Sequence, residues 1–246
     1  MSWERFKLSC RKRVRTVYNA VVDLGRRSTV LPASLPELAE IRERARLRTP
    51  INEHLETLFL ESLPLSPRLI VELGVARGES TFVFARVAKL CHATLVSVDI
   101  NDCSGASAYD KWIFIQQDDL LFAKEFPQWC QARGLSPAID LLFIDTSHLY
   151  EHTCQEIAAY FPLLAPQAKV FFHDTNMGHF IFRKDGSLEL GWDNRRGVIR
   201  ALEDYFHKKF DEKKEFADII PPWLIRHQPH CGGLTILDRL PFLSPS

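Results

Sequence analysis

The chain has 246 residues, of which 46% are apolar, and its 31 basic and 31 acidic side chains balance to a formal net charge of zero. A chain of this length buries one full α/β core, and the balanced charge argues against a nucleic-acid-binding surface. It contains neither an apolar run long enough for a membrane span nor a signal-peptide core. The six cysteines are scattered without a C-x-x-C pair, which is typical of thiols in a reducing cytoplasm.

Residues 1–50 are interpreted as an N-terminal helical extension of a single domain over residues 51–246. The extension is rich in arginine, and its pattern predicts a basic helix up to about Arg27 and a second helix over 36–48. Charge runs of this kind are usually solvated faces. We therefore expect the extension to pack on the domain or to join copies of the chain in a homo-oligomer, rather than to bind a membrane.

From residue 51 onward strand and helix patterns alternate, which indicates parallel strands covered by helices on both faces. The strands are expected at 68–73, 94–99, 112–116, 139–144, 169–173, 219–226 and 233–238. The helices are expected at 52–63, 80–90, 122–133 with a break at Pro127, 151–164 and 196–206. The predicted fold is α/β: a Rossmann-like, doubly wound, mostly parallel sheet of seven strands. The long loop over 176–196 is expected to cover a substrate.

The first strand leads into a turn with the sequence Glu72-Leu-Gly-Val-Ala-Arg-Gly78. Gly74, Ala76 and Gly78 bring the backbone close to a ligand, and a side chain at Gly74 is expected to occupy the ligand's space. Ser80 or Thr81 is placed to cap the following helix. The turn lacks the G-x-G-x-x-G pattern of dinucleotide folds and has an acid, Glu72, at the strand end. This E-x-G-x-x-x-G form resembles the first motif of S-adenosylmethionine (SAM)-dependent methyltransferases of the Rossmann-like class, which implies that these residues contact SAM.

Acidic residues follow the next two strands, at the edge where such sheets bind ligands. Asp99 ends the second strand, 21 residues beyond Gly78 (99 − 78), a spacing at which an acid binds the two ribose hydroxyls. Asp118 or Asp119, after the third strand, is placed to accept a hydrogen from the adenine amino group, and the sequence leaves this choice open. NAD needs the same ribose acid, so an NAD-dependent oxidoreductase is the alternative. Glu72 and the absence of a G-x-G turn favour SAM.

A second resemblance lies in Asp140-Leu-Leu-Phe-Ile-Asp-Thr-Ser-His-Leu-Tyr-Glu-His152 and in the following Pro162-Leu-Leu-Ala-Pro-Gln-Ala-Lys-Val-Phe-Phe-His-Asp-Thr175. These segments resemble the methyltransferases grouped with cephalosporin-hydroxylase-like proteins and antibiotic-sugar O-methyltransferases. That group shares an I-D-x-x-H-x-Y-E segment, a helix, and a strand that ends in an acidic pair. The resemblance covers residues 67–175. It implies SAM-dependent O-methylation of a hydroxyl on a small molecule such as a sugar or a polyketide.

In metal-dependent members of that group, the first acid and the acids ending the fifth strand hold Mg²⁺, which maps onto Asp145 and Asp174. The histidine three residues after the first acid is the general base, which maps onto His148 beside Asp145. This sequence has His173 where the group often has a glutamate, and imidazole suits Mn²⁺, Fe²⁺ or Zn²⁺ better than Mg²⁺. We therefore expect Asp145, His173 and Asp174 to hold a divalent cation, Mg²⁺ or Mn²⁺. A neutral histidine beside it can accept a proton at pH 7.

Two further interpretations need to be weighed. His148 to His152 formally matches H-x-x-E-H, the inverted zinc-peptidase signature, which requires all five residues to lie in one helix and a downstream glutamate ligand. Here the five residues straddle the end of a predicted strand, and a peptidase would leave the SAM-like turn unexplained, so the sequence argues against this interpretation. The chain could also be a degenerate methyltransferase fold that binds a partner without catalysis, and His173 is the residue that favours this interpretation.

Overall fold

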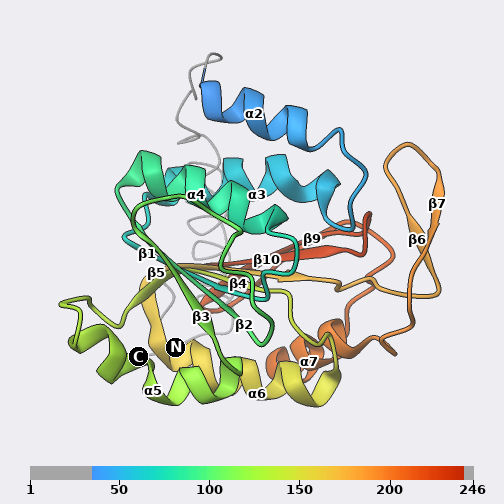
Figure 1. The fold of residues 1–246 in the computed structure, drawn as a ribbon. Coiled ribbons are helices and arrows are strands. Elements are labelled where there is room, and N and C mark those ends of the chain that lie inside the picture. The colour runs from blue at the N-terminus through green and yellow to red at the C-terminus, as the bar shows by residue number, and fades with distance from the viewer. Residues whose placement is uncertain (1–34, 241–246) are drawn as a thin grey trace, which may run out of the picture. The chain divides into compact units, whose positions relative to one another are not determined.

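The computed structural model describes residues 35–240, so the predicted basic helix up to Arg27 lies outside the described residues. A sheet of eight strands in the order β3-β2-β1-β4-β5-β10-β9-β8 forms the centre, and β6 and β7 form a separate hairpin (Figure 1). The strands are β1 (Leu69–Leu73), β2 (Thr94–Asp99), β3 (Trp112–Gln116), β4 (Ile139–Ile144), β5 (Leu164–His173), β6 (Phe180–Phe182), β7 (Leu188–Leu190), β8 (Phe216–Ile220), β9 (Trp223–Gln228) and β10 (Leu234–Arg239).

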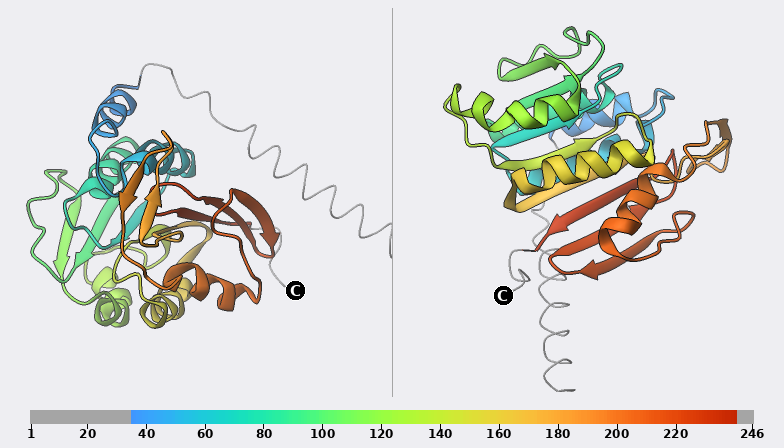
Figure 2. Two further views of the ribbon diagram at one scale, coloured as in Figure 1. Left: turned by 90° about the vertical axis from the view of Figure 1, so that its right-hand side faces the viewer. Right: turned by 90° about the horizontal axis from the view of Figure 1, so that it is seen from below.

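Helices cover both faces of the sheet, as the alternating pattern predicts. The helices are α2 (Pro36–Arg44), α3 (Leu55–Ser62), α4 (Glu79–Cys91), α5 (Asp119–Gln131), α6 (Tyr150–Tyr160) and α7 (Gly197–Phe206), and short 3₁₀ turns lie at Asn52–His54, Leu63–Leu65 and Phe161–Leu163. In Figures 1 and 2, α3 and α4 lie on one face and α5, α6 and α7 lie on the other. No helix among residues 35–240 is long and apolar enough to cross a membrane.

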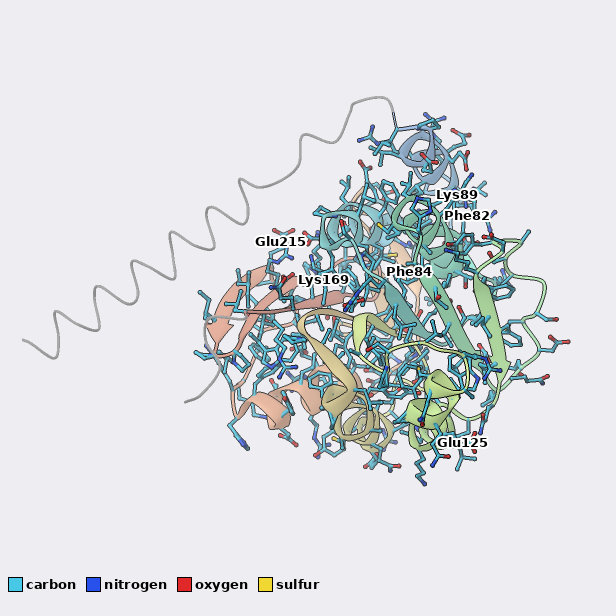
Figure 3. The ribbon with its side chains drawn as sticks, turned by 90° about the vertical axis from the view of Figure 1, so that its left-hand side faces the viewer. Phe82, Phe84, Lys89, Glu125, Lys169 and Glu215 are labelled. Atoms are coloured by element: carbon cyan, nitrogen blue, oxygen red, sulfur yellow. The ribbon has the colours of Figure 1, made fainter. Side chains whose placement is uncertain are left out.

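The core consists of apolar side chains from the central strands and from the inner faces of the helices. All five residues of β1 are buried, as expected for a strand covered on both faces. On one face Phe84 of α4, which is labelled in Figure 3, packs on Phe143 of β4. Their ring centroids lie 5.3 Å apart. On the other face Phe122 and Phe126 of α5 lie in the core with their rings edge to face.

The parallel half of the sheet, β3-β2-β1-β4-β5, has the strand order of a Rossmann-type fold. Its register aligns the strand ends: Leu73 of β1 lies opposite Val98 of β2 and Ile144 of β4. Ile144 in turn lies opposite Phe172 of β5. The residues that follow these four positions are Gly74, Asp99, Asp145 and His173. The strand ends therefore bring the predicted site residues to one edge of the sheet.

The sheet has eight strands instead of the predicted seven, because the segment expected as one strand over 219–226 is two. Pro221 and Pro222 lie between β8 and β9, which pair with each other in antiparallel fashion. Proline has no N–H group to donate to a strand ladder, so two consecutive prolines end β8 and begin a turn. The three last strands of the sheet are antiparallel, with β10 against β5.

Two helices, α5 and α6, also differ in extent from the prediction. The predicted break at Pro127 is wrong, because α5 runs from Asp119 to Gln131 without interruption. Pro127 lies on the exposed side of α5, whereas Phe126 beside it is buried, so packing outweighs the missing backbone donor. The other helix, α6, ends at Tyr160, just before Pro162, and β5 begins at Leu164 rather than at residue 169.

The second predicted helix of the N-terminal extension is present as α2. Its side chains reach α4 through two ion pairs, Arg44 with Glu79 at 2.7 Å and Arg86 with Glu40 at 2.5 Å. The domain boundary at residue 50 stays a prediction. Within the predicted loop over 176–196, the hairpin of β6 and β7 exposes apolar side chains on its outer face: Phe180, Phe182, Leu188 and Leu190.

Candidate active site

The turn that follows β1 is bound to the end of β2 through Asp99. The backbone N–H groups of Val75 and Ala76 donate to Asp99 Oδ2 at 2.9 and 3.1 Å. Asn101 donates to Asp99 Oδ1 from its backbone and from its side-chain nitrogen, at 2.8 and 3.2 Å. Burial alone would raise the pKa of Asp99, but these hydrogen bonds hold it below its ordinary value. Asp99 is therefore a carboxylate that lies directly against the turn, where the sequence predicts a ribose contact.

The glycine at the start of this turn is required by the protein itself. Gly74 has φ +86°, and a Cβ atom built on it would lie 2.0 Å from the backbone oxygen of Asp145. A side chain at Gly74 would therefore collide first with the end of β4. The sequence analysis expects a collision with a ligand instead, and this expectation is corrected. Gly78 is also in the left-handed region, at φ +77°, where its Cβ would lie 3.0 Å from that of Ala106.

Glu72 lies beneath the turn, completely buried, with three hydroxyl groups bound to its carboxylate. Ser80 and Thr81 of α4 donate at 2.6 and 2.8 Å, and Ser97 of β2 donates at 2.5 Å. Burial nevertheless raises the pKa of Glu72 to about 7. The predicted cap at Ser80 or Thr81 is wrong, because the N-cap of α4 is Gly78, without a side-chain bond, and both hydroxyls bind Glu72. Glu72 and Ser80 thus join β1, β2 and α4 below the predicted cofactor site.

The structure distinguishes the two acids that follow β3. Asp118 is the N-cap of α5 and accepts a hydrogen bond from the backbone nitrogen of Leu121 at 2.9 Å, and it stays partly exposed. Asp119 is buried and turned toward α6, where its Oδ1 lies 3.1 Å from His152 Nε2. Of the two, only Asp118 is open to a ligand at the edge of the sheet.

Asp145, His148 and Asp174 come together at the ends of β4 and β5. His148 lies between the two carboxylates, with Nε2 2.9 Å from Asp145 Oδ1 and Nδ1 3.1 Å from Asp174 Oδ2. One potential ligand atom from each of the three side chains lies within 4.8 Å of the others. Burial alone would lower the pKa of His148, but the hydrogen bond to Asp145 and the charges of both carboxylates raise it.

His173 lies behind these carboxylates and is almost completely buried. Its Nδ1 is 3.1 Å from Asp145 Oδ1 and 3.2 Å from Asp174 Oδ1. Burial alone would lower the pKa of His173, but the two carboxylates raise it to about 9. The ring therefore donates a hydrogen bond to Asp145, while its charge also faces the carboxylate of Asp174. The three side chains whose ligand atoms come together are those of Asp145, His148 and Asp174. The sequence analysis expects His173, rather than His148, as the third ligand.

The main chain at this site is unusual in ways that the sequence analysis did not detect. His148 and Asp174 both have left-handed backbones, with φ +58° and +55°, and such strain is often found at functional sites. A Cβ atom on Gly197 would lie 2.3 Å from the backbone oxygen of His148, and one on Gly232 would lie 2.3 Å from Asp174 Oδ1. Both glycines therefore allow distant segments to approach the site closely.

A pocket of about 380 Å³ opens beside this group, lined by the first turn of α6, the loop before α7 and α7 itself. Its lining residues are Leu149, Tyr150, Glu151, Trp192, Asp193, Asn194, Arg195 and Arg200. The ring of Trp192 lies 5.9 Å from that of His148, and the guanidinium of Arg200 lies 4.0 Å from the centroid of Tyr150. The pocket thus combines aromatic faces with charges of both signs, next to His148.

The donor set fits a divalent cation. Asp174 Oδ1 and His173 Nε2 are buried without a hydrogen-bond partner among the described residues, and two carboxylates meet at one point. Carboxylate oxygens with an adjacent imidazole are ligands that Mg²⁺, Mn²⁺ or Zn²⁺ accept in proteins. Asp145 and Asp174 are the residues best placed to hold such an ion.

Comparison with known proteins agrees with this geometry. Residues 71–175 match the family model described as a methyltransferase domain. No curated protein sequence matches the chain. Among solved structures, the chain is similar to a putative caffeoyl-CoA O-methyltransferase from Staphylococcus aureus, with 17% identity, TM-score 0.52 and coverage of 90% of this chain and 98% of that one.

Two other solved structures show the same fold. An O-methyltransferase from Bacillus cereus in complex with SAH (S-adenosylhomocysteine) has 15% identity and TM-score 0.54, with 86% of this chain and 94% of that one covered. The MycE methyltransferase of the mycinamycin biosynthetic pathway, in complex with Mg, SAH and mycinamycin VI, has 16% identity and TM-score 0.50. The match covers 83% of this chain, which spans 53% of the MycE chain. The matched segment contains the turn after β1 and the acids that end β2, β4 and β5, so residues 71–175 are similar to a methyltransferase domain, as the resemblance in the sequence implies.

Proposed function

We propose that this chain transfers the methyl group of SAM to a hydroxyl oxygen of a small molecule, and that Asp145, His148 and Asp174 activate that hydroxyl. The observation that carries this proposal is the contact between the two halves of the site. Gly74 of the turn lies against the backbone of Asp145, so the predicted SAM-binding turn and the acid–histidine group share one edge of the sheet. A methyl donor held at the turn would therefore lie next to His148.

On the donor side, SAM supplies a methyl group on a positively charged sulfonium. Asp99 is placed to accept hydrogen bonds from the ribose hydroxyls, and Asp118 from the adenine amino group. The four hydrogen bonds that Asp99 already accepts occupy the lone pairs of its two oxygens. A ribose must therefore replace one of them, and the longest, from the Asn101 side chain, is the one that it replaces most easily.

On the acceptor side, His148 takes the hydroxyl proton. The carboxylate of Asp174 faces Nδ1 at 3.1 Å and so favours a proton on that nitrogen, which leaves Nε2 as the basic nitrogen. Nε2 faces Asp145 in this structure and becomes available to the acceptor when the Asp145 carboxylate binds another group. We propose that Asp145 and Asp174 hold a divalent cation, with His173 behind them. Such a cation lowers the pKa of a bound hydroxyl.

The pocket beside His148 supports a polyhydroxylated acceptor such as a sugar. The exposed ring of Trp192 offers a flat apolar face next to the base, and Glu151, Asp193 and Arg195 offer hydrogen-bonding groups around it. We further propose a cytoplasmic location, since five cysteines of the described residues are free thiols. From the sequence alone, we also propose that the chain forms a homo-oligomer through residues 1–50. We further propose that nucleic acid is not a partner.

The test begins with calorimetric titration of the protein with SAM and, separately, with NAD. We expect SAM to bind and NAD not to bind. Transfer of labelled methyl groups from SAM to a panel of sugars and polyketide-like alcohols follows, with and without a chelator and with Mg²⁺, Mn²⁺ or Zn²⁺ added back. His148→Ala is expected to lower turnover by about 10²–10⁴ without changing the affinity for SAM, as for loss of a positioned base.

The exposed His179 provides the matched control, because His179→Ala removes an imidazole whose side chain is 77% exposed. Binding of NAD instead of SAM would indicate an oxidoreductase. Binding of SAM without transfer to any acceptor would favour a degenerate methyltransferase fold. Full activity in the chelator would remove the cation from the proposal and leave His148 as the base.

A further inference from the structure

A second group of metal-ligating side chains lies between α5 and α6. It consists of Asp119, the first residue of α5, and of His152 and Glu156, one helical turn apart on α6. His152 Nε2 lies 3.1 Å from Asp119 Oδ1 and 3.7 Å from Glu156 Oε1. One ligand atom from each residue lies within 4.8 Å of the others, as in the group around His148. We call these three residues the α5–α6 cluster.

Two carboxylate oxygens of this cluster are buried and unpaired. Glu156 is 0% exposed and Asp119 is 6% exposed, and neither Glu156 Oε2 nor Asp119 Oδ2 has a hydrogen-bond partner among residues 35–240. The other oxygen of Glu156 accepts a hydrogen bond from the Thr146 hydroxyl at 2.6 Å. Buried polar atoms without a partner are costly, and each needs a ligand, a water or a proton to explain it.

The charge of the α5–α6 cluster points to a cation. Within the described part of the chain, His152 is the only basic side chain that forms an ion pair with either carboxylate. Two neighbouring carboxylates inside a protein cannot both stay ionised without compensating charge. The cluster therefore has a place for positive charge that either a proton or a metal ion can fill.

We propose that Asp119, His152 and Glu156 bind a divalent transition-metal cation such as Zn²⁺. One imidazole nitrogen and two carboxylate oxygens form a ligand set that Zn²⁺ uses with a fourth, open position. Mg²⁺ favours oxygen ligands and retains several waters, so it fits this set less well. The site has an entrance, because the His152 side chain is 23% exposed while the two acids lie below it.

The bound ion would join the first turn of α5 to α6. Tyr160, one turn beyond Glu156, already donates a hydrogen bond to the backbone oxygen of Asp119 at 2.6 Å. Asp118, which precedes Asp119, is the residue that we propose for adenine. The ion is therefore expected to stabilise the backbone at the cofactor edge, without contact with the reacting atoms.

The fold also separates this site from the zinc-peptidase motif noted in the sequence. His148 lies before α6 in a left-handed conformation, and α6 begins only at Tyr150. The two histidines of H-x-x-E-H therefore point into two different clusters, His148 toward Asp145 and His152 toward Asp119. The peptidase interpretation, which needs one continuous helix, is wrong.

The test is the number of Zn²⁺ ions bound per chain, measured by elemental analysis after equilibrium dialysis against Zn²⁺. The wild type is compared with His152→Ala, with the near-isosteric Glu156→Gln and with the exposed-histidine control His179→Ala. Because the group around His148 can also take Zn²⁺, the informative quantity is the difference between variants. We expect His152→Ala and Glu156→Gln each to bind one Zn²⁺ fewer than the wild type, and His179→Ala to bind the same number.

A second measurement uses the thermal unfolding midpoint with and without Zn²⁺. We expect Zn²⁺ to raise the midpoint of the wild type more than that of Glu156→Gln. Equal Zn²⁺ stoichiometry in the wild type, His152→Ala and Glu156→Gln would overturn the proposal. So would a Glu156→Gln protein that is more stable than the wild type at pH 8 and binds as much Zn²⁺, because Asp119 and Glu156 would then share a proton. Circular dichroism shows whether His152→Ala is folded. If it is not folded, the comparison of the wild type with Glu156→Gln tests the proposal. These counts do not depend on methyl transfer.

Discussion

Replacement of Glu72 by glutamine should remove a pH-dependent loss of stability. Glu72 is completely buried, and burial raises its pKa to about 7 in the folded protein from an ordinary value of 4.5. Between these two values the unfolded chain releases the proton while the folded protein keeps it. The contribution of Glu72 to stability is therefore fully present below pH 4.5 and is lost as the pH rises through 7.

The size of the effect follows from the two pKa values. One unit of pKa shift corresponds to about 1.4 kcal/mol, so titration of Glu72 should lower the free energy of unfolding by about 2–3 kcal/mol between pH 5 and pH 8. Glu72→Gln has no such proton, and the hydroxyls of Ser80, Thr81 and Ser97 can rotate to donate to its oxygen or accept from its nitrogen. We therefore expect the variant to gain about 2–3 kcal/mol relative to the wild type over this range.

Urea unfolding at several pH values measures this difference directly. Glu43→Gln is the matched control, since the Glu43 side chain is 71% exposed and its substitution should leave the pH profile unchanged. Profiles of wild type and Glu72→Gln that run parallel from pH 5 to pH 8 would refute the reasoning. They would mean that the three hydroxyl donors keep the carboxylate ionised in spite of its burial.

Three further predictions concern the turn, the cofactor and the acceptor. Gly74→Ala should destabilise the fold by several kcal/mol, because its Cβ meets backbone at 2.0 Å, whereas Gly134→Ala, with φ +66° and open space around it, should cost about 1 kcal/mol in chemical denaturation. Asp99→Ala should weaken SAM binding by about 1–3 kcal/mol in calorimetry, and an unchanged dissociation constant in the folded variant would refute the ribose assignment. Trp192→Ala should raise the KM for the acceptor more than it lowers kcat. Leu149→Ala, at the same pocket, should raise the KM less. An unchanged KM in Trp192→Ala would exclude stacking of the acceptor on Trp192.

The parallel half of the fold could be predicted from sequence because each of its strands is a short apolar run that ends at a polar residue or a glycine. The edge with Asp99, Asp145 and Asp174 followed from the rule that parallel strands place their carboxyl ends together. The antiparallel half was less accessible. Pro221 and Pro222 divide one apolar segment into two strands, and the partner of each strand is set by tertiary pairing.

The details of the site depended on contacts between distant segments, which local patterns do not encode. The orientation of Glu72, down into the protein rather than up toward a ligand, depends on hydroxyls from β2 and α4. The roles of Gly197 and Gly232 depend on their approach to His148 and Asp174, which lie 49 (197 − 148) and 58 (232 − 174) residues away in the sequence. The sequence identified Asp119 as a site residue, but its burial against α6 could only come from the packing of two helices.

The residue at which α6 begins determines the direction in which each side chain of the helix points. His148 belongs to the loop, and Tyr150 is the first helical residue, so His152 and Glu156 reach Asp119 only because a single residue, Leu149, separates His148 from that helix. Each residue added or removed ahead of a fixed helix end turns the helix by about 100°. A single insertion after His148 would leave the acid–histidine group at the sheet edge intact and rotate His152 and Glu156 away together. The length of this short segment therefore fixes the positions of two groups of side chains at once, the group around His148 and the α5–α6 cluster.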